Sequence, residues 1–234
     1  MHITYRFEFS EREPYVFEVD TRRDATQLPE DLPAWTHLKH CQCVNCPLAE
    51  SEQARCPAAV DLIELVDVFH GESAFQKVRI EVTTPQRGYF KRTNLEEGLR
   101  SLMGLVMATS ACPILGQLRP LALHHMPFAS EEEFILRSVS MFLLKQYFHQ
   151  RETGVADWQL KGLIELNRQL QLVNQAMWQR IHSACEEDSN LKALLSFFSL
   201  ASSVTFSLEA QLQKLRQHFL EGQPDPAPTL QTFT

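Results

Sequence analysis

The chain has 234 residues, of which 44% are hydrophobic, and it contains 12 prolines and 8 glycines. This composition is typical of a globular protein with a sizeable core and excludes a disordered or collagen-like chain. The 22 basic and 29 acidic side chains give a net charge of −7, which disfavours nucleic acid or an anionic membrane surface as a partner. No apolar run approaches the length of a membrane span, and the polar start differs from a signal peptide, so we expect a cytoplasmic protein.

Two β-hairpins are predicted in the first part of the chain. Residues 3–9 and 15–19 alternate between apolar and polar side chains and are rich in aromatic and β-branched residues, with a polar turn between them. Residues 78–82 alternate in the same way, and a turn with proline and glycine leads into a return strand that starts at Tyr89. Between the hairpins, the apolar residues within 60–69 indicate a short amphipathic helix.

The rest of the chain has the periodicity of helices. The sequences Thr93-Asn94-Leu95-Glu96 and Ser130-Glu131-Glu132-Glu133 are each typical of a capping box at a helix start. Asp157 and Asn190 are suited to cap two longer helices, and the polar break at residues 186–189 predicts that these two form an antiparallel hairpin. The four expected helices cover residues 93–107, 130–147, 157–181 and 190–219.

We therefore predict an α+β fold with two β-hairpins and a cysteine knuckle in residues 1–93, a mainly helical part in residues 94–222, and a proline-rich mobile tail in residues 223–234. The two long C-terminal helices carry apolar groups beyond the face that each can bury against the other. This surplus predicts contacts with the earlier helices, with a second copy of the chain as a homodimer, or with another protein partner.

Four of the six cysteines fall within sixteen residues, namely Cys41, Cys43, Cys46 and Cys56. Clustered cysteines without an export signal are typical of a metal site rather than of a disulfide framework. The two-residue gap between Cys43 and Cys46 lets both sulfurs reach one ion, and Cys56 returns within reach of the same point. The sequence predicts a structural Zn²⁺ bound by these four cysteines, with an iron–sulfur cluster as the alternative occupant.

The fourth ligand of this metal is open from the sequence. Cys41 is the nearest candidate, and His40 and Cys112 are the alternatives. Cys46, Cys56 and Cys112 each precede a proline, which favours the first position of a helix, so each cysteine is expected at an N-cap. The free N–H groups there would face the sulfur and favour its thiolate form, as a metal site requires.

Cys112 supports a second hypothesis, that of a thiol-dependent enzyme. It lies among small residues after a predicted helix, and His124 and His125 follow twelve and thirteen positions later. A cysteine and a histidine can act as nucleophile and base, which makes these three residues the catalytic candidates. The competing interpretation of Cys112 is a buried apolar thiol.

The common signatures of nucleotide-binding and hydrolytic enzymes are absent from the sequence. It contains no GxxxxGK[ST], GxGxxG, GxSxG or HExxH motif. The sequence therefore predicts a metal-binding protein with a binding or regulatory role and no identifiable reaction. The alternatives are the thiol-dependent enzyme and an iron–sulfur or redox protein.

Overall fold

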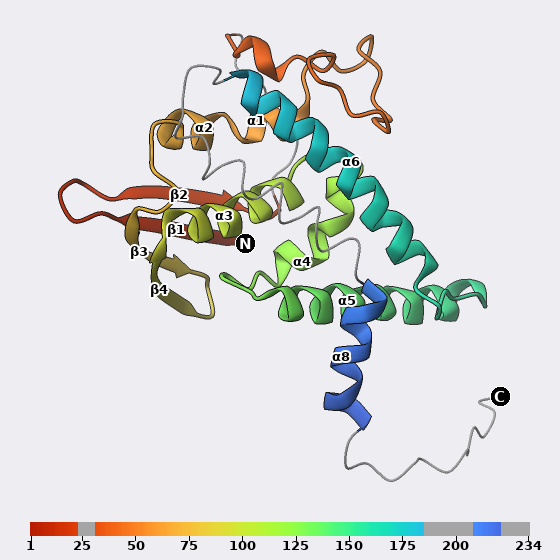
Figure 1. The fold of residues 1–234 in the computed structure, drawn as a ribbon. Coiled ribbons are helices and arrows are strands. Elements are labelled where there is room, and N and C mark those ends of the chain that lie inside the picture. Colours follow the sequence, from red (N-terminus) through yellow and green to blue (C-terminus); the bar gives the residue numbers. More distant parts are fainter. Residues whose placement is uncertain (23–30, 185–207, 221–234) are drawn as a thin grey trace.

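The computed structural model describes residues 1–22, 31–184 and 208–220. A four-stranded sheet lies at one end of the molecule, and the long helices extend away from it (Figure 1). This arrangement confirms the α+β class predicted from the sequence, with a sheet in the N-terminal part and helices after it.

The sheet is antiparallel and has the strand order β2-β1-β3-β4. Both predicted hairpins are present: β1 (His2–Glu8) pairs with β2 (Tyr15–Asp20), and β3 (Lys77–Thr83) pairs with β4 (Gly88–Asn94). The two hairpins join because β1 also pairs with β3, with Phe7 opposite Ile80. A single sheet therefore connects segments that lie more than 70 residues apart.

The two faces of the sheet differ in character. One face buries apolar side chains that alternate along the strands, as the period of two predicts. The other face carries an ion-pair chain that includes Arg6, Glu8 and Arg79. The residues of the buried face are Ile3, Tyr5, Phe7, Phe17, Val19, Val78, Ile80 and Val82.

Helix α3 (Leu95–Ala108) packs closely on the buried face of the sheet. The closest approach is at Gly98, where a Cβ atom would overlap the Ile80 side chain and lie 2.7 Å from Cε1 of Phe7. Because α3 follows directly after β4, no loop separates the sheet from its covering helix. The segment from β3 to α3 thus forms one continuous packing unit.

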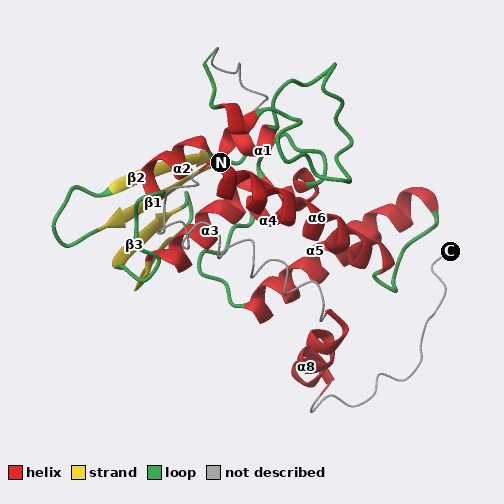
Figure 2. Ribbon diagram, turned by 45° about the horizontal axis from the view of Figure 1, so that its top comes forward, coloured by secondary structure: helices red, strands yellow, loops and turns green. Residues whose placement is uncertain are grey.

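The remaining helices form the far side of the molecule. Figure 2 shows α1, α2 and α3 beside the sheet, with α5 and α6 beyond them. The bounds are α1 Pro57–Asp61, α2 Ile63–Phe69, α4 Arg119–Leu123, α5 Glu131–Thr153, α6 Lys161–Ala184 and α8 Leu208–Leu220, with 3-10 turns at Ala34–Thr36 (η1) and Leu115–Leu118 (η2).

The capping predictions have different outcomes. Ser130 caps α5 with both hydrogen bonds of the capping box, as predicted. The predicted box at Thr93 is wrong, because Asn94 is the N-cap of α3 and makes no side-chain capping bond, while Thr93 Oγ1 donates to Glu97. The helix predicted from Asp157 begins at Lys161, although the Asp157 carboxylate accepts the N–H of Gly162 at 2.7 Å.

The single helix predicted for residues 60–69 is two short helices, α1 and α2, which meet at Leu62. The second long helix and its turn fall largely in residues 185–207, outside the described residues, and so does the tail at residues 221–234. The antiparallel hairpin, the mobile tail and self-association through these helices stay predictions. No helix within the described ranges is long and apolar enough to cross a membrane.

One cluster of buried side chains extends from the sheet into the helical part. It includes Ile3 and Phe7 of β1, Leu99 of α3, and Met177 and Ile181 of α6. The two parts predicted as residues 1–93 and 94–222 therefore share a hydrophobic core. The cysteine segment lies against this core, since Cys56 belongs to the cluster.

Candidate functional site

The predicted cysteine knuckle lies between η1 and α1. The chain turns between Cys43 and Cys46, where the N–H of Cys46 donates to the carbonyl of Cys43 at 3.0 Å. Asn45, inside this turn, donates its amide to the carbonyl of Gln169 in α6 at 3.1 Å. The turn is therefore fixed to a helix that follows it by more than 120 residues.

One of the three Cys-Pro pairs, Cys56-Pro57, lies at a helix start, as the sequence predicts. Cys56 is the N-cap of α1, and the N–H groups of Ala58 and Ala59 are directed at its sulfur and lower its pKa, although burial raises that pKa more strongly. The prediction of an N-cap at Cys112 is wrong, because Cys112 precedes a turn and the N-cap of η2 is Ile114. The N–H groups of Leu115 and Ile114 in this turn nevertheless lower the pKa of Cys112, while burial raises it more strongly. Both sulfurs therefore face hydrogen-bond donors that stabilise a thiolate.

The third pair is different. Cys46 and Pro47 precede residues that form no helix, so the prediction of an N-cap at Cys46 is wrong. After Cys46 the chain is irregular, and the next helix, α1, begins only after Cys56.

The structure brings four cysteines into one neighbourhood. Cys56 is buried and belongs to the hydrophobic core, and Cys43, Cys46 and Cys112 are half-buried against the same core. Burial raises the pKa of Cys43 to about 12, and the charges of Cys56, Cys46 and Cys112 add to this increase. The pKa of Cys112 is likewise raised by burial and then by Cys56 and Cys46. These four thiols therefore interact with one another electrostatically.

Arg180 of α6 lies beside this group and is 1% exposed. Its Nη1 donates to the carbonyls of Trp35 at 2.5 Å and His37 at 2.6 Å, and its Nη2 donates to the carbonyl of Leu38 at 3.1 Å. Within the described residues its Nε–H has no hydrogen-bond partner, and no carboxylate forms an ion pair with the guanidinium.

The positive charge of Arg180 acts on the cysteines. It lowers the pKa of Cys43 and of Cys56, opposing the effect of burial. Removing a guanidinium from water is costly unless a negative charge compensates it. Because burial raises the pKa values of Cys43 and Cys56, these side chains are neutral as free thiols and do not compensate the charge of Arg180 in that form.

The other predicted ligands have separate places. Cys41 is half-buried, has a φ angle of 47°, and is not among the neighbours that raise the pKa values of Cys43 and Cys112. His40 shares a hydrogen bond of 2.6 Å with the hydroxyl of Ser183 in α6. Among the described residues, no three His, Cys, Asp or Glu side chains are placed so that they could hold a metal ion.

The catalytic candidates are placed in different environments. His124 is exposed at the end of α4, whereas His125 packs against Tyr5, and its Nε2 lies 2.5 Å from the Tyr5 hydroxyl. No hydrogen bond joins Cys112 to either histidine in the described part of the chain. The structure therefore gives no support to a Cys112–histidine pair.

His125 belongs to a hydrogen-bond chain that connects the sheet, α3 and the loop after α4. The N–H of Phe128 donates to the Ser101 hydroxyl at 3.2 Å, and the Tyr5 hydroxyl lies 2.7 Å from the same oxygen. Burial lowers the pKa of His125 to about 3, with a contribution from the charge of Arg137, so its ring is neutral. A chain in which Ser101 donates to Tyr5 and Tyr5 donates to His125 uses every hydroxyl proton.

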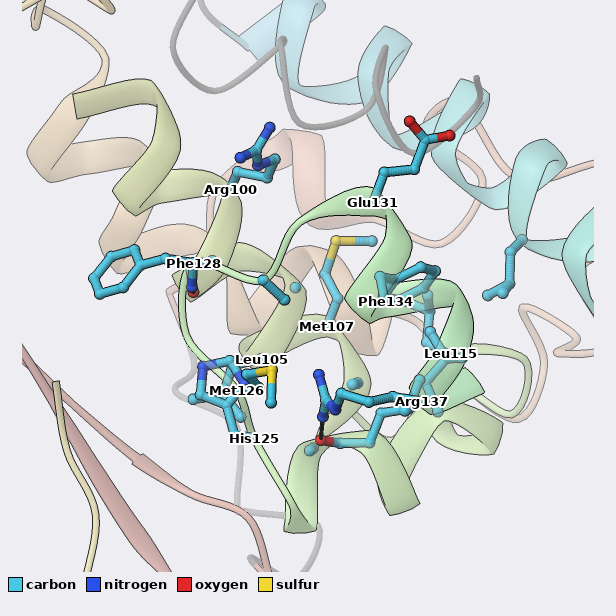
Figure 3. Close-up of a pocket in the computed structure, with 18 of the residues that line it drawn as sticks. Arg100, Leu105, Met107, Leu115, His125, Met126, Phe128, Glu131, Phe134 and Arg137 are labelled. Carbon is cyan, nitrogen blue, oxygen red and sulfur yellow. Dashed lines mark hydrogen bonds between the residues drawn. The ribbon is translucent and has the colours of Figure 1, made fainter. Parts of the chain in front are cut away.

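This hydrogen-bond chain borders a pocket of about 330 Å³ between α3, α4, α5 and α6. Its surface is mainly apolar, with Leu105 and Met107 of α3 and Phe134 of α5 among its lining residues. Figure 3 shows Met107, Phe134 and Arg137 around the same space, with Arg100 and Glu131 extending away from them.

Comparison with known proteins places the whole described molecule in one family. The model of a family described as Domain of unknown function (DUF6901) matches residues 3–220. The chain belongs to this family. No curated protein and no solved structure matches the chain. The DUF6901 match includes the four grouped cysteines, Arg180 and the pocket.

Sequence analysis missed three features of this DUF6901 chain: Arg180, the hydrogen-bond chain at His125 and the pocket. Arg180 lies on the face of α6 that also buries Met177 and Ile181. An arginine among apolar residues of a predicted helix was therefore the available signal. The Tyr5–Ser101 and Tyr5–His125 contacts have no local signal, because they join positions 96 and 120 residues apart.

Proposed function

We propose that this DUF6901 chain is an iron–sulfur protein in which Cys43, Cys46, Cys56 and Cys112 bind the cluster. The cluster would connect the cysteine loop to the end of α3 and, through Arg180, to α6. Its role would be binding or regulation rather than an enzymatic reaction. The observation that carries the proposal is the buried Arg180, which lacks a carboxylate partner in the described residues and lies beside this group of thiols.

The charge of the site supports a metal centre. Four neutral thiols leave the buried guanidinium uncompensated, and a buried charge without a counter-charge costs several kcal/mol. Four thiolates around a metal centre carry a net negative charge, because the metal neutralises only part of theirs. Arg180 is therefore suited to the bound state of the site and poorly suited to the free thiols.

The proposal of a cluster rather than a single zinc ion concerns the size of the metal core. Zinc–sulfur bonds of about 2.3 Å draw all four sulfurs close around one ion, whereas an iron–sulfur cluster has several metal atoms and spreads its four thiolates around a larger core. Among the described residues no three His, Cys, Asp or Glu side chains are placed so that they could hold a metal ion, so the metal content of the protein decides between the two occupants.

Cys112 is the preferred fourth ligand over Cys41. The sulfurs of Cys56, at a helix start, and of Cys112, before a turn, both face backbone N–H groups, and such donors are common around ligating sulfurs. Cys112 also responds to the charges of Cys46 and Cys56. Cys41 remains the alternative that the spacing in the sequence predicts.

The proposal is tested by the metal content of matched variants purified without oxygen. We expect iron and acid-labile sulfide in the wild-type protein and in Cys41→Ser, and the loss of most of both in Cys43→Ser and Cys112→Ser. Circular dichroism of each variant shows whether the helices are retained.

Two results would reject this assignment. Zinc without sulfide in the wild-type protein would establish a single-ion site, as first predicted from the sequence. A folded wild-type protein without any metal would remove the metal centre altogether. Loss of iron from Cys41→Ser together with its retention in Cys112→Ser would show that Cys41, and not Cys112, is the fourth ligand.

A further inference from the structure

The pocket between α3, α4, α5 and α6 has an apolar wall and a polar wall. Leu105, Leu115 and Leu121 line the side formed by α3, η2 and α4. Asn167 and Asn174 of α6 line the opposite part, and they are seven residues apart, so they lie on one face of the helix. A volume of about 330 Å³ is at the lower end of the range for small-molecule sites.

Asn174 is an unusual residue for a pocket wall without a ligand. The residue is 6% exposed, and within the described residues its side-chain amide makes no hydrogen bond. Its amide atoms are not among the fully buried unpaired atoms, so the accessible surface that they keep lies at the pocket that Asn174 lines. An amide of this kind that lines a cavity is therefore positioned for a polar group of a ligand.

Arg137 provides a second polar group in the same pocket. Its Nη2 donates to the carbonyls of Leu121 at 2.9 Å and His124 at 2.7 Å, and its other N–H groups have no partner within the described residues. Burial lowers the pKa of Arg137, which is the mark of a partly desolvated positive charge. The charge of Glu133 opposes this decrease, but the Glu133 carboxylate accepts the N–H of Ser130 and forms no ion pair with Arg137. The guanidinium, hydrogen-bonded to carbonyl oxygens, therefore retains the capacity to bind a carboxylate.

The charge of the pocket favours an anion. Its lining includes two arginines, Arg100 and Arg137, and one carboxylate, Glu131, which is exposed; Arg100 also forms an ion pair with Glu97 at 3.9 Å. His125 contributes no charge, because burial lowers its pKa to about 3. The positive charge nearest the apolar wall is that of Arg137, which Figure 3 shows beside Met107 and Phe134.

We propose that this pocket binds a small amphipathic monocarboxylate, with its apolar body against the leucines of α3 and α4 and its carboxylate at Arg137 and Asn174. The carboxylate would accept hydrogen bonds from the guanidinium and from the Asn174 amide, and so provide the partners that both side chains lack. This site is separate from the proposed cluster, although both involve the loop of Cys112, since Ala108 and Leu115 on either side of it line the pocket.

The test uses the complete chain as purified, with or without metal, and isothermal titration with octanoate and octan-1-ol. The two probes have the same chain length and differ in the headgroup. We expect octanoate to bind at least about tenfold more tightly than octan-1-ol, because a hydrogen bond to a charged group contributes about 1.5–3 kcal/mol and 1.4 kcal/mol is a factor of ten. Equal affinities, or no heat of binding from octanoate, would overturn the proposal.

Variants locate the headgroup. Arg137→Gln and Asn174→Leu should each weaken octanoate binding, Arg137→Gln by about tenfold, while octan-1-ol binding changes little. Arg151→Gln is the matched control, because Arg151 is an exposed arginine on the same helix whose side chain contacts Tyr147.

Arg137→Gln also removes the hydrogen bonds to the carbonyls of Leu121 and His124 and could shift α4. Asn174→Leu leaves these bonds intact and therefore tests the headgroup site independently. An Arg151→Gln effect as large as that of Arg137→Gln would show attraction to surface charge only and would overturn the site. Unchanged octanoate affinity in both pocket variants would do the same.

Discussion

The hydrogen-bond chain at Tyr5 and the cysteine group at Arg180 both join distant parts of the sequence, but only the first needs no further charge. The hydroxyl protons of Ser101 and Tyr5 each have an acceptor within the chain, and the neutral His125 needs no counter-charge. Arg180 has a full positive charge, 1% exposure and an unpaired Nε–H within the described residues. A complete buried network stabilises the chain by itself, whereas an incomplete one indicates that a further component belongs to it.

The same contrast separates the regions around these groups. The sheet and α3 are held together by the apolar face of the strands and by the close approach at Gly98. The cysteine loop has little regular structure and reaches α6 through polar contacts, at Asn45, His40 and Arg180. The sheet region is therefore expected to fold without a ligand, and the cysteine region to depend on the proposed metal centre.

The largest effect is expected from Arg180→Met. In the metal-containing protein this change leaves the thiolate charge uncompensated and three carbonyls without their donor, which should lower the free energy of unfolding by about 3–5 kcal/mol. The loss should be smaller in the metal-free protein, because neutral thiols need no positive charge. Chemical denaturation of both forms measures the difference.

Arg168→Met is the control for this experiment, since Arg168 is an exposed residue of the same helix, with 70% of its side chain accessible. It should change the stability of either form by less than about 0.5 kcal/mol. If Arg180→Met lowers the free energy of unfolding equally with and without metal, Arg180 does not compensate the charge of a metal centre.

Acid provides the second test, on the complete network. The pKa of His125 is lowered from 6.5 to about 3, so below pH 6.5 the unfolded chain binds a proton that the folded chain does not. Stability from this group is therefore present above pH 6.5 and is lost as the pH falls towards 3. Between pH 7 and pH 5 the wild type should lose about 2 kcal/mol more than His125→Gln.

The comparison of wild type with His125→Gln removes the acid sensitivity of the cysteines, which is common to both proteins. Denaturation curves at several pH values give the two slopes. Parallel slopes would mean that His125 is not held in the neutral form by its surroundings.

Gly98→Ala is expected to have the smallest effect and the most informative sign. Helix propensity alone predicts that this change stabilises α3 by about 1 kcal/mol. The added methyl group would meet Ile80 and Phe7, and overpacking of this kind costs roughly 1–3 kcal/mol. We therefore expect a net loss of about 1 kcal/mol in thermal or chemical unfolding, and a gain would show that the sheet and α3 are less closely packed.

The sequence was informative where the signal is local. The two hairpins follow from strict alternation, and the capping box at Ser130 follows from the residues that form it. The box at Thr93 was wrong because β4 continues to Asn94, so Thr93 is still part of a strand when the helix begins. The pairing of β1 with β3 was not predicted, because no local pattern specifies which edges of two hairpins meet.

The candidate sites show the same limit. The spacing of Cys43, Cys46 and Cys56 in the sequence predicts a metal site, which stays a prediction, and the place of Cys112 beside them depends on how α3 packs against α1. Arg180 and Asn174 belong to α6, where a polar residue on a predicted helix is usually exposed. Their burial is a property of the tertiary structure and not of the helix pattern.

The central claim is that Arg180 balances an iron–sulfur cluster held by four cysteines, and one measurement tests it most directly. Wild-type protein purified without oxygen is analysed for iron, acid-labile sulfide and zinc, together with its visible absorption spectrum. The account predicts a brown protein with iron and sulfide in comparable amounts and little zinc. A colourless, folded protein that contains either zinc alone or no metal would contradict it.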